Sequence, residues 1–180
     1  MIKKLASKVV YKNPWMTVQE DQVEFANGHT GIYGIVVKSD FALIIPFDGT
    51  HFHLVSQFRY PLQKISLEFP QGKHEDDPTA DPLQMACDEL REETGLVTKN
   101  IKEIGYLYEA SGYSTQAFHI FYATDFQRGE KKLDTTEVGL ETLLLTEAEL
   151  ENMILDGTLT DAPTVSAFGL WKLKRDRNLL

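Results

Sequence analysis

Hydrophobic and polar positions in the first third of the chain follow the two-residue repeat of β-strands. Residues 16–25 are rich in strand-forming side chains, and Asn27-Gly28 is a turn signal that leads into a second run over residues 31–38. The apolar run at residues 41–47 has the length of a buried strand. Over residues 51–60 mostly polar side chains at odd positions alternate with mostly apolar ones at even positions, which is typical of a strand with two different faces. These patterns predict an N-terminal part built of strands.

The next pattern has the period and the end signals of a helix. Asp81 suits the N-cap, Pro82 the first helical position and Gly95 the left-handed residue after the end. A helix is therefore predicted from about Pro82 to Thr94. Its apolar stripe is expected to consist of Leu83, Ala86, Cys87 and Leu90.

Three acidic side chains of this helix share one face. Glu89, Glu92 and Glu93 are neighbours because positions three and four apart meet on a helix surface. Like charges at this spacing oppose helix formation by roughly a few tenths of a kcal/mol per pair, which a bound cation would offset. Carboxylates favour magnesium or manganese over zinc. A solvated acidic face is the plainer interpretation, but the preceding turn over residues 69–72 is able to aim backbone carbonyls at an ion.

The rest of the chain predicts strands at residues 101–109, 117–124 and 140–145. A capping box at residues 146–149 opens a helix that ends near Gly157, and a last helix runs from Asp161 to about Arg175. Strands, one helix, more strands and then helices indicate an α+β fold or a mixed-sheet sandwich rather than a repeated βαβ array.

Composition narrows the class of protein. The chain has 180 residues, 42% of them hydrophobic and 25% charged, which suits one soluble domain with a full-sized core. The net charge of −9 is spread along the chain and argues against nonspecific binding to nucleic acid or membranes. Neither a signal peptide nor a membrane span is expected. Cys87 is the single cysteine and is expected in the core, so we expect a reducing cytoplasm.

The run at residues 89–96 resembles the signature of the Nudix hydrolases, G-x5-E-x7-R-E-U-x-E-E-x-G-U. It matches E-U-x-E-E-x-G-U at every fixed position, and Gly72 at the end of residues 67–72 looks like the signature glycine. Asn13-Pro14-Trp15 and residues 57–61, Gln-Phe-Arg-Tyr-Pro, are similar to the ADP-ribose and nucleoside diphosphate sugar branch. The resemblance implies a mixed sheet between helices over residues 38–180. It also implies that residues 1–37 form a strand-rich appendage of a homodimer.

The chain departs from the signature inside the loop and at the start of the helix. The loop after Gly72 is two residues longer than the signature requires, so Ala80 and Asp88 stand where the first Glu and the Arg are expected. An acidic residue of the lengthened loop is able to replace the missing Glu. The simplest consequence of losing the signature Glu and Arg together is the loss of a structural ion pair. The loop acids are Glu75, Asp76 and Asp77.

The resemblance also implies roles for particular residues. Glu89, Glu93 and the carbonyl of Gln71 would bind Mg²⁺, with Mn²⁺ as a possible substitute, and Glu92 would act beside them. The general base would be Glu137, with Glu141 as the alternative because the register of that loop is open.

Four further residues are predicted to contact substrate. Arg59 has the forked geometry that grips phosphate oxygens. Trp15 and Tyr113 offer flat faces on which a base stacks, or they serve packing or dimer contacts. Glu68 would contact ribose or base, or only pair with a neighbour.

The expected activity is magnesium-dependent hydrolysis of the pyrophosphate bond of a nucleoside diphosphate sugar, which yields a nucleoside monophosphate and a sugar phosphate. ADP-ribose is the favoured substrate. Ser111 stands about where ADP-ribose hydrolases usually carry a proline, so GDP-mannose and UDP-glucose stay open. The alternative is a Nudix-fold nucleotide-binding module with weak or no catalysis, which the changes at Ala80 and Asp88 would explain.

Overall fold

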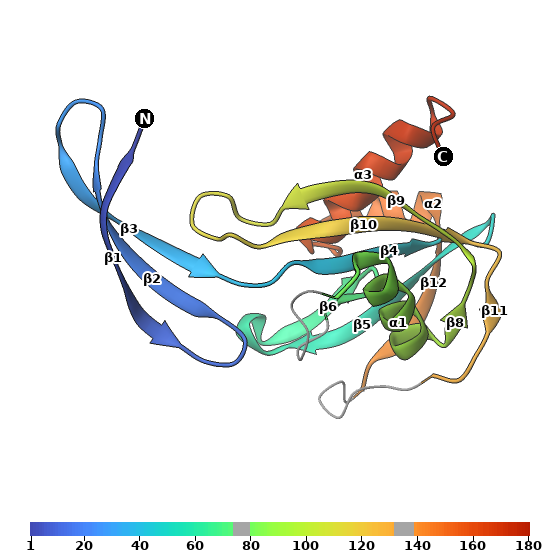
Figure 1. Cartoon of the computed structure of the whole chain (residues 1–180). Coiled ribbons are helices and arrows are strands. Elements are labelled where there is room, and N and C mark those ends of the chain that lie inside the picture. Colours follow the sequence, from blue (N-terminus) through green and yellow to red (C-terminus); the bar gives the residue numbers. More distant parts are fainter. Residues whose placement is uncertain (74–79, 132–138) are drawn as a thin grey trace. The chain divides into compact units, whose positions relative to one another are not determined.

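A computed structural model describes residues 1–73, 80–131 and 139–180 of the chain (Figure 1). The chain folds into two compact units. The N-terminal unit comprises Met1–Asp40 and Tyr108–Ala117, and the larger unit comprises Phe41–Leu107 and Phe118–Leu180. The domain boundary predicted after residue 37 stays a prediction.

The N-terminal unit is an antiparallel sheet of three strands in the order β1-β2-β3. These strands are β1 (Lys3–Lys12), β2 (Thr17–Glu24) and β3 (Thr30–Val37), and Gly28 turns the β2–β3 hairpin with a φ of +80°. Every residue of β1 is exposed, while β2 buries Asp21 and Val23. The sequence predicted β2 and β3 but not β1.

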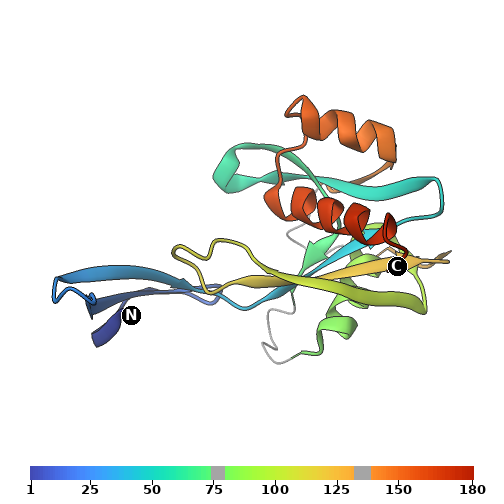
Figure 2. The ribbon, with the colours of Figure 1, turned by 90° about the horizontal axis from the view of Figure 1, so that it is seen from above.

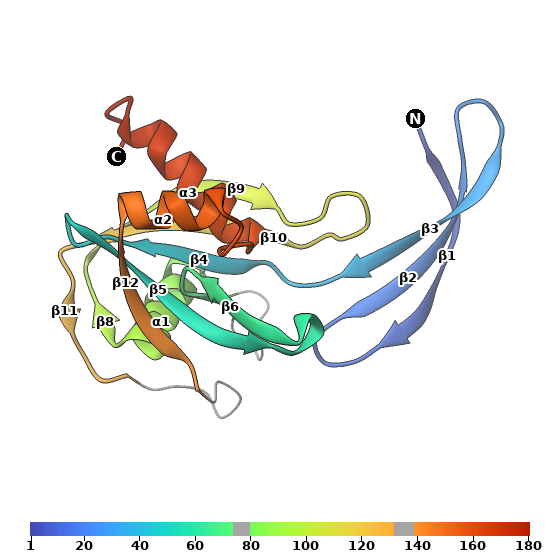
Figure 3. The ribbon, with the colours of Figure 1, turned by 180° about the vertical axis from the view of Figure 1, so that it is seen from behind.

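The larger unit contains two main sheets, as the mixed α+β prediction requires. One sheet has the order β7-β4-β10-β9, in which β4 and β10 run parallel, and the other has the order β12-β5-β6 (Figure 3). A short pair, β8 and β11, accompanies them. The strand bounds are β4 (Phe41–Pro46), β5 (His51–Arg59), β6 (Lys64–Glu68), β7 (Gln71–Gly72), β8 (Leu96–Val97), β9 (Asn100–Tyr108), β10 (Ala117–Thr124), β11 (Gln127–Arg128) and β12 (Glu141–Thr146).

Strand β4 is fully buried because both of its faces are covered. Alternate residues such as Leu43 enter one hydrophobic cluster with Trp171 of helix α3 (Ala162–Arg175). The intervening residues such as Ile44 enter a second cluster with Leu90 of helix α1 (Pro82–Thr94). Figure 2 shows α1 and α3 on opposite sides of β10. The predicted sheet between helices is therefore confirmed.

The helix boundaries match the sequence prediction closely, whereas the predicted stripe of α1 is partly wrong. Gly95 caps α1 with a φ of +73°, and the Thr146–Glu149 capping box opens α2 (Glu147–Leu155). Leu83 is exposed and Met85 is buried instead, because the buried face is turned toward Glu89 and Glu93. Cys87 is half-buried rather than in the core. No helix among the described residues is long and apolar enough to cross a membrane.

Candidate active site

The turn between β6 and β7 is fixed by hydrogen bonds to two other elements. The N–H of Phe69 donates to Oγ1 of Thr164 in the first turn of α3, at 2.9 Å. The N–H of Ile44 in β4 donates to the carbonyl of Pro70, also at 2.9 Å. The backbone of the following residues, Gln71 and Gly72, is therefore held in one place.

Gly72 lies directly against the carboxylate of Glu89. A Cβ on residue 72 would stand 2.5 Å from Oε2 of Glu89 and closer still to Oε1. Only a glycine leaves room for this carboxylate, which is 8% exposed. The signature glycine is thus explained by the side chain that packs against it, and Glu89 is held against β7.

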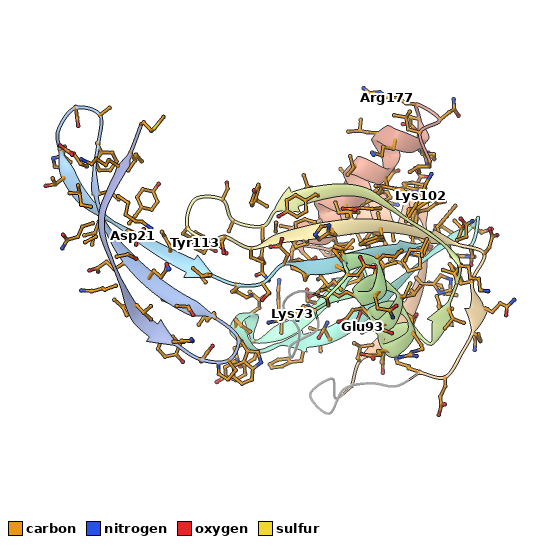
Figure 4. The ribbon with its side chains drawn as sticks, viewed as in Figure 1. Asp21, Lys73, Glu93, Lys102, Tyr113 and Arg177 are labelled. Atoms are coloured by element: carbon orange, nitrogen blue, oxygen red, sulfur yellow. The ribbon has the colours of Figure 1, made fainter. Side chains whose placement is uncertain are left out.

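Glu93, one helical turn later, contacts the same strand. Its Oε2 accepts a hydrogen bond from the N–H of Gln71 at 3.0 Å, and the side chain is buried at 1% exposure. Figure 4 labels Glu93 on α1 and Lys73 just after β7, which locates the site in the larger unit. Two acidic side chains of α1 therefore meet the short segment that contains Gln71 and Gly72.

The carbonyl of Gln71 is directed toward the same side as its N–H. Gln71 lies opposite Leu43 in the antiparallel β4–β7 pair. Hydrogen-bonded and non-hydrogen-bonded pairs alternate along such a ladder. Because the neighbouring Ile44 bonds to Pro70, Gln71 and Leu43 form a non-hydrogen-bonded pair. The polar groups of such a residue point away from the partner strand. Because the N–H meets Glu93, the carbonyl is aimed toward α1.

Glu92 and the two departures from the signature make other contacts. Glu92 is one-third exposed and lies 3.7 Å from Arg91, which also pairs with Asp88 at 3.5 Å. Asp88 further accepts a hydrogen bond from Gln84, and Ala80 packs on the core cluster of α1. The sequence correctly predicted the shared face, but only Glu89 and Glu93 are shown here to contact β7.

In the described ranges no three His, Cys, Asp or Glu side chains converge as a ligand group. Glu89, Glu93 and the carbonyl of Gln71 are nevertheless all hard oxygen donors, the type that magnesium and manganese prefer. Two buried carboxylates and one main-chain carbonyl therefore fit the predicted divalent cation.

A second charged cluster adjoins the turn. Nε of Arg59 donates to Oε1 of Glu68 at 2.9 Å, and a second guanidinium nitrogen donates to Oε2. Burial opposes ionisation of Glu68, but the bonds from Arg59 outweigh it and lower the pKa of Glu68. The pKa of Asp161, which caps α3, is raised by burial and by the nearby charge of Glu68. Arg59 keeps 38% of its side chain exposed, so the protein covers it only in part.

The remaining predicted residues lie in other parts of the chain. Trp15 and Tyr113 belong to the N-terminal unit and are exposed. Glu141 is exposed at the start of β12. Glu75, Asp76, Asp77 and Glu137 lie outside the described residues.

Two residues of the site were missed by the sequence analysis. Asp161 accepts a hydrogen bond from the N–H of Thr164 at 2.9 Å, and Thr164 in turn accepts the bond from Phe69. The cap signal before α3 was visible in the sequence. The contact of Thr164 with Phe69, 95 positions earlier in the chain, was not visible there.

Comparison with known proteins agrees with the fold and the motifs. Residues 2–36 match the family model described as the nucleoside diphosphate sugar hydrolase N-terminal domain. The chain is 27% identical to an ADP-ribose pyrophosphatase of Bacillus subtilis (strain 168), over 96% of this chain and 93% of that protein. It is also 27% identical to a methanol dehydrogenase activator of Bacillus methanolicus, over 92% of this chain and 89% of that protein.

A solved structure has the same fold over nearly the whole chain. The crystal structure of an ADP compounds hydrolase superposes with a TM-score of 0.86 and covers 99% of this chain and 97% of its own, at 22% identity. The chain therefore has the same fold as that solved structure.

Proposed function

We propose that this chain, a Nudix hydrolase of the ADP-ribose pyrophosphatase branch, splits the pyrophosphate bond of a nucleoside diphosphate sugar in a magnesium-dependent reaction. The products are a nucleoside monophosphate and a sugar phosphate, and ADP-ribose is the favoured substrate. The observation that supports this most directly is the meeting of Glu89 and Glu93 with Gln71 and Gly72.

The buried carboxylates would hold the cation. Glu89, fixed against Gly72, and Glu93, fixed by the N–H of Gln71, supply negative charge at one point, and the carbonyl of Gln71 faces the same side. A divalent cation, when bound, neutralises pyrophosphate charge and activates water. Mn²⁺ is expected to substitute because it accepts the same oxygen ligands.

Other residues would bind substrate and move the proton. Arg59 is oriented by Glu68 and would contact a phosphate of the pyrophosphate through its exposed edge. Glu92, more exposed than its neighbours, would assist beside the cation. Glu137 is proposed as the general base that accepts the proton of the attacking water, with Glu141 as the alternative.

The test is release of nucleoside monophosphate from ADP-ribose, GDP-mannose, UDP-glucose and diadenosine polyphosphates, with magnesium, with manganese and with a chelator. Wild-type turnover should require the metal and should be fastest on ADP-ribose. Glu93→Gln should lose about 10³-fold or more in kcat, since a neutral amide binds a divalent cation poorly.

Glu151→Gln on α2 is the matched control, because it makes the same chemical change in an ion pair with Lys172. It should retain wild-type turnover. Glu137→Gln and Glu141→Gln in the same assay identify the base by which of them loses activity. Nucleotide binding without turnover on any substrate would instead favour the binding module.

We also propose that the chain forms a homodimer through the N-terminal unit. Its sheet leaves apolar side chains on the surface, among them Val9, Tyr11, Ile32 and Tyr33. Because the consecutive residues Ile32 and Tyr33 point to opposite faces of β3, both faces of this small sheet carry exposed apolar groups, which indicates an interaction surface. Light scattering coupled to gel filtration should give twice the chain mass of 20.5 kDa, and Val9→Lys with Ile32→Lys should give the monomer.

A further inference from the structure

The side-chain amide of Gln71 contains an acceptor whose orientation is fixed by a neighbour. Its Nε2 donates to Oε2 of Glu68 at 2.8 Å. Both oxygens of Glu68 accept hydrogen bonds from the guanidinium of Arg59, so this carboxylate is an acceptor toward Gln71 as well. The bond therefore determines which end of the amide is nitrogen, and Oε1 faces away from Glu68.

This Oε1 atom is buried, and no donor in the described part of the chain reaches it. Leaving a buried acceptor unsatisfied costs about 1–3 kcal/mol, so each such atom in a native protein needs an explanation. The other buried unsatisfied side-chain atoms among the described residues belong to Asp21, His53, Gln116 and Trp171. Of this set, only the Gln71 atom lies in the candidate active site.

The surroundings of Gln71 restrict what a ligand could donate. Arg59 bonds to the same carboxylate as Gln71 and is the group that would bind phosphate. A phosphate oxygen that carries no proton cannot satisfy an acceptor. The nearest donors on a pyrophosphate ester are therefore hydroxyl groups of the sugar attached to it.

We propose that Gln71 is a specificity-determining residue, whose Oε1 accepts a hydrogen bond from a hydroxyl of the sugar carried by the pyrophosphate. The inference rests on the proposed function and deepens it. Gln71 then has two roles. Its main-chain carbonyl would bind the cation beside α1, and its side-chain Oε1 would bind the sugar. Nucleoside diphosphates esterified with a hydroxylated sugar would be preferred over esters of simple alcohols.

The experiment compares kcat/KM for ADP-ribose and for ADP esterified with a simple alkyl alcohol, in the wild type and in Gln71→Leu. The preference for ADP-ribose should fall about tenfold in the variant, the usual effect of losing one neutral hydrogen bond. The concentration of magnesium that gives half-maximal rate should not change, because residue 71 keeps its main-chain N–H and carbonyl. Gln71→Met, which has similar length and no such acceptor, should behave in the same way.

Gln84→Leu is the matched control, since Gln84 is exposed on α1 and its amide bonds only to Asp88 in the described structure. It should keep the wild-type preference. An equal loss on both substrates in the Gln71 variants, or no loss at all, would overturn the proposal, because Oε1 would then serve the fold through an internal water.

Failure of the proposed function is distinguished by binding. If the wild type hydrolyses neither ester, dissociation constants of both are measured by calorimetry in magnesium. A binding preference for ADP-ribose that drops about tenfold in Gln71→Leu supports the role of Oε1 without turnover. An unchanged preference rejects it.

Discussion

Replacing Gly72 by alanine tests whether the packing of Glu89 on the strand sets the geometry of the metal site. The new Cβ would stand 2.5 Å from Oε2 of Glu89, whereas ordinary van der Waals contact begins at 3.4 Å. Because β7 is held by its bonds to β4 and α1, the carboxylate must retreat by about 1 Å. Displacement of a catalytic group by 1 Å costs about 10²-fold in rate.

The assay is the initial rate of ADP-ribose hydrolysis as a function of magnesium concentration. Gly72→Ala should lower kcat/KM about 100-fold and raise the half-maximal magnesium concentration, and overpacking should also lower the free energy of unfolding by about 1–3 kcal/mol, so rates are measured well below the unfolding temperature. Gly169→Ala on α3 is the control, because a Cβ there meets nothing within 4 Å. Wild-type rate and metal response in Gly72→Ala would refute the argument that this contact positions Glu89.

Three further changes test the electrostatics and packing of the larger unit. Glu68→Gln should lower the free energy of unfolding by about 2 kcal/mol at pH 7, less than for a fully buried pair because Arg59 is partly exposed. Since the pKa of Glu68 is lowered on folding, this contribution is complete above the ordinary carboxyl pKa of about 4.3 and disappears as the pH falls further, so denaturant curves of variant and wild type should converge in acid. Gly105→Ala should destabilise by about 1–3 kcal/mol, because its Cβ would overlap Cδ2 of Leu170, and unchanged thermal unfolding would contradict this packing. Thr146→Ala should cost about 1 kcal/mol by removing the capping box of α2, whereas Thr50→Ala, in an exposed turn where the main-chain N–H makes the bond to Asp48, should be nearly neutral in the same denaturation series.

The features that the sequence predicts well are those with local signals. Pro82 and Gly95 mark the ends of α1, and the spacing of Glu89 and Glu93 places both on one face whatever the rest of the chain does. The strand β1 was missed because it is exposed along its whole length. Without a buried face, its residues show no alternation of polar and apolar positions.

The features that sequence reasoning could not predict depend on pairing between distant segments. The register of β5 and β6 places Arg59 opposite Lys64 and Glu68 opposite Val55, so the bond between Arg59 and Glu68 requires both side chains to reach along the hairpin, which no local pattern predicts. The bond between Thr164 and Phe69 requires α3 to return to the turn. The exposure of Leu83 shows the same limit. The buried face of α1 packs on β4 and β7, and the pattern of the helix alone does not show where those strands lie.

The outer strand β1 has a consequence for how the protein resists aggregation. An exposed edge strand of ten residues is a template onto which other chains add strands. Four of those ten residues are lysines, Lys3, Lys4, Lys8 and Lys12, in a protein whose net charge is −9. Positive charges repeated along an edge repel an identical strand that approaches it. Neutralising these lysines by acetylation should therefore promote fibrous or amorphous association before it affects the fold of the larger unit.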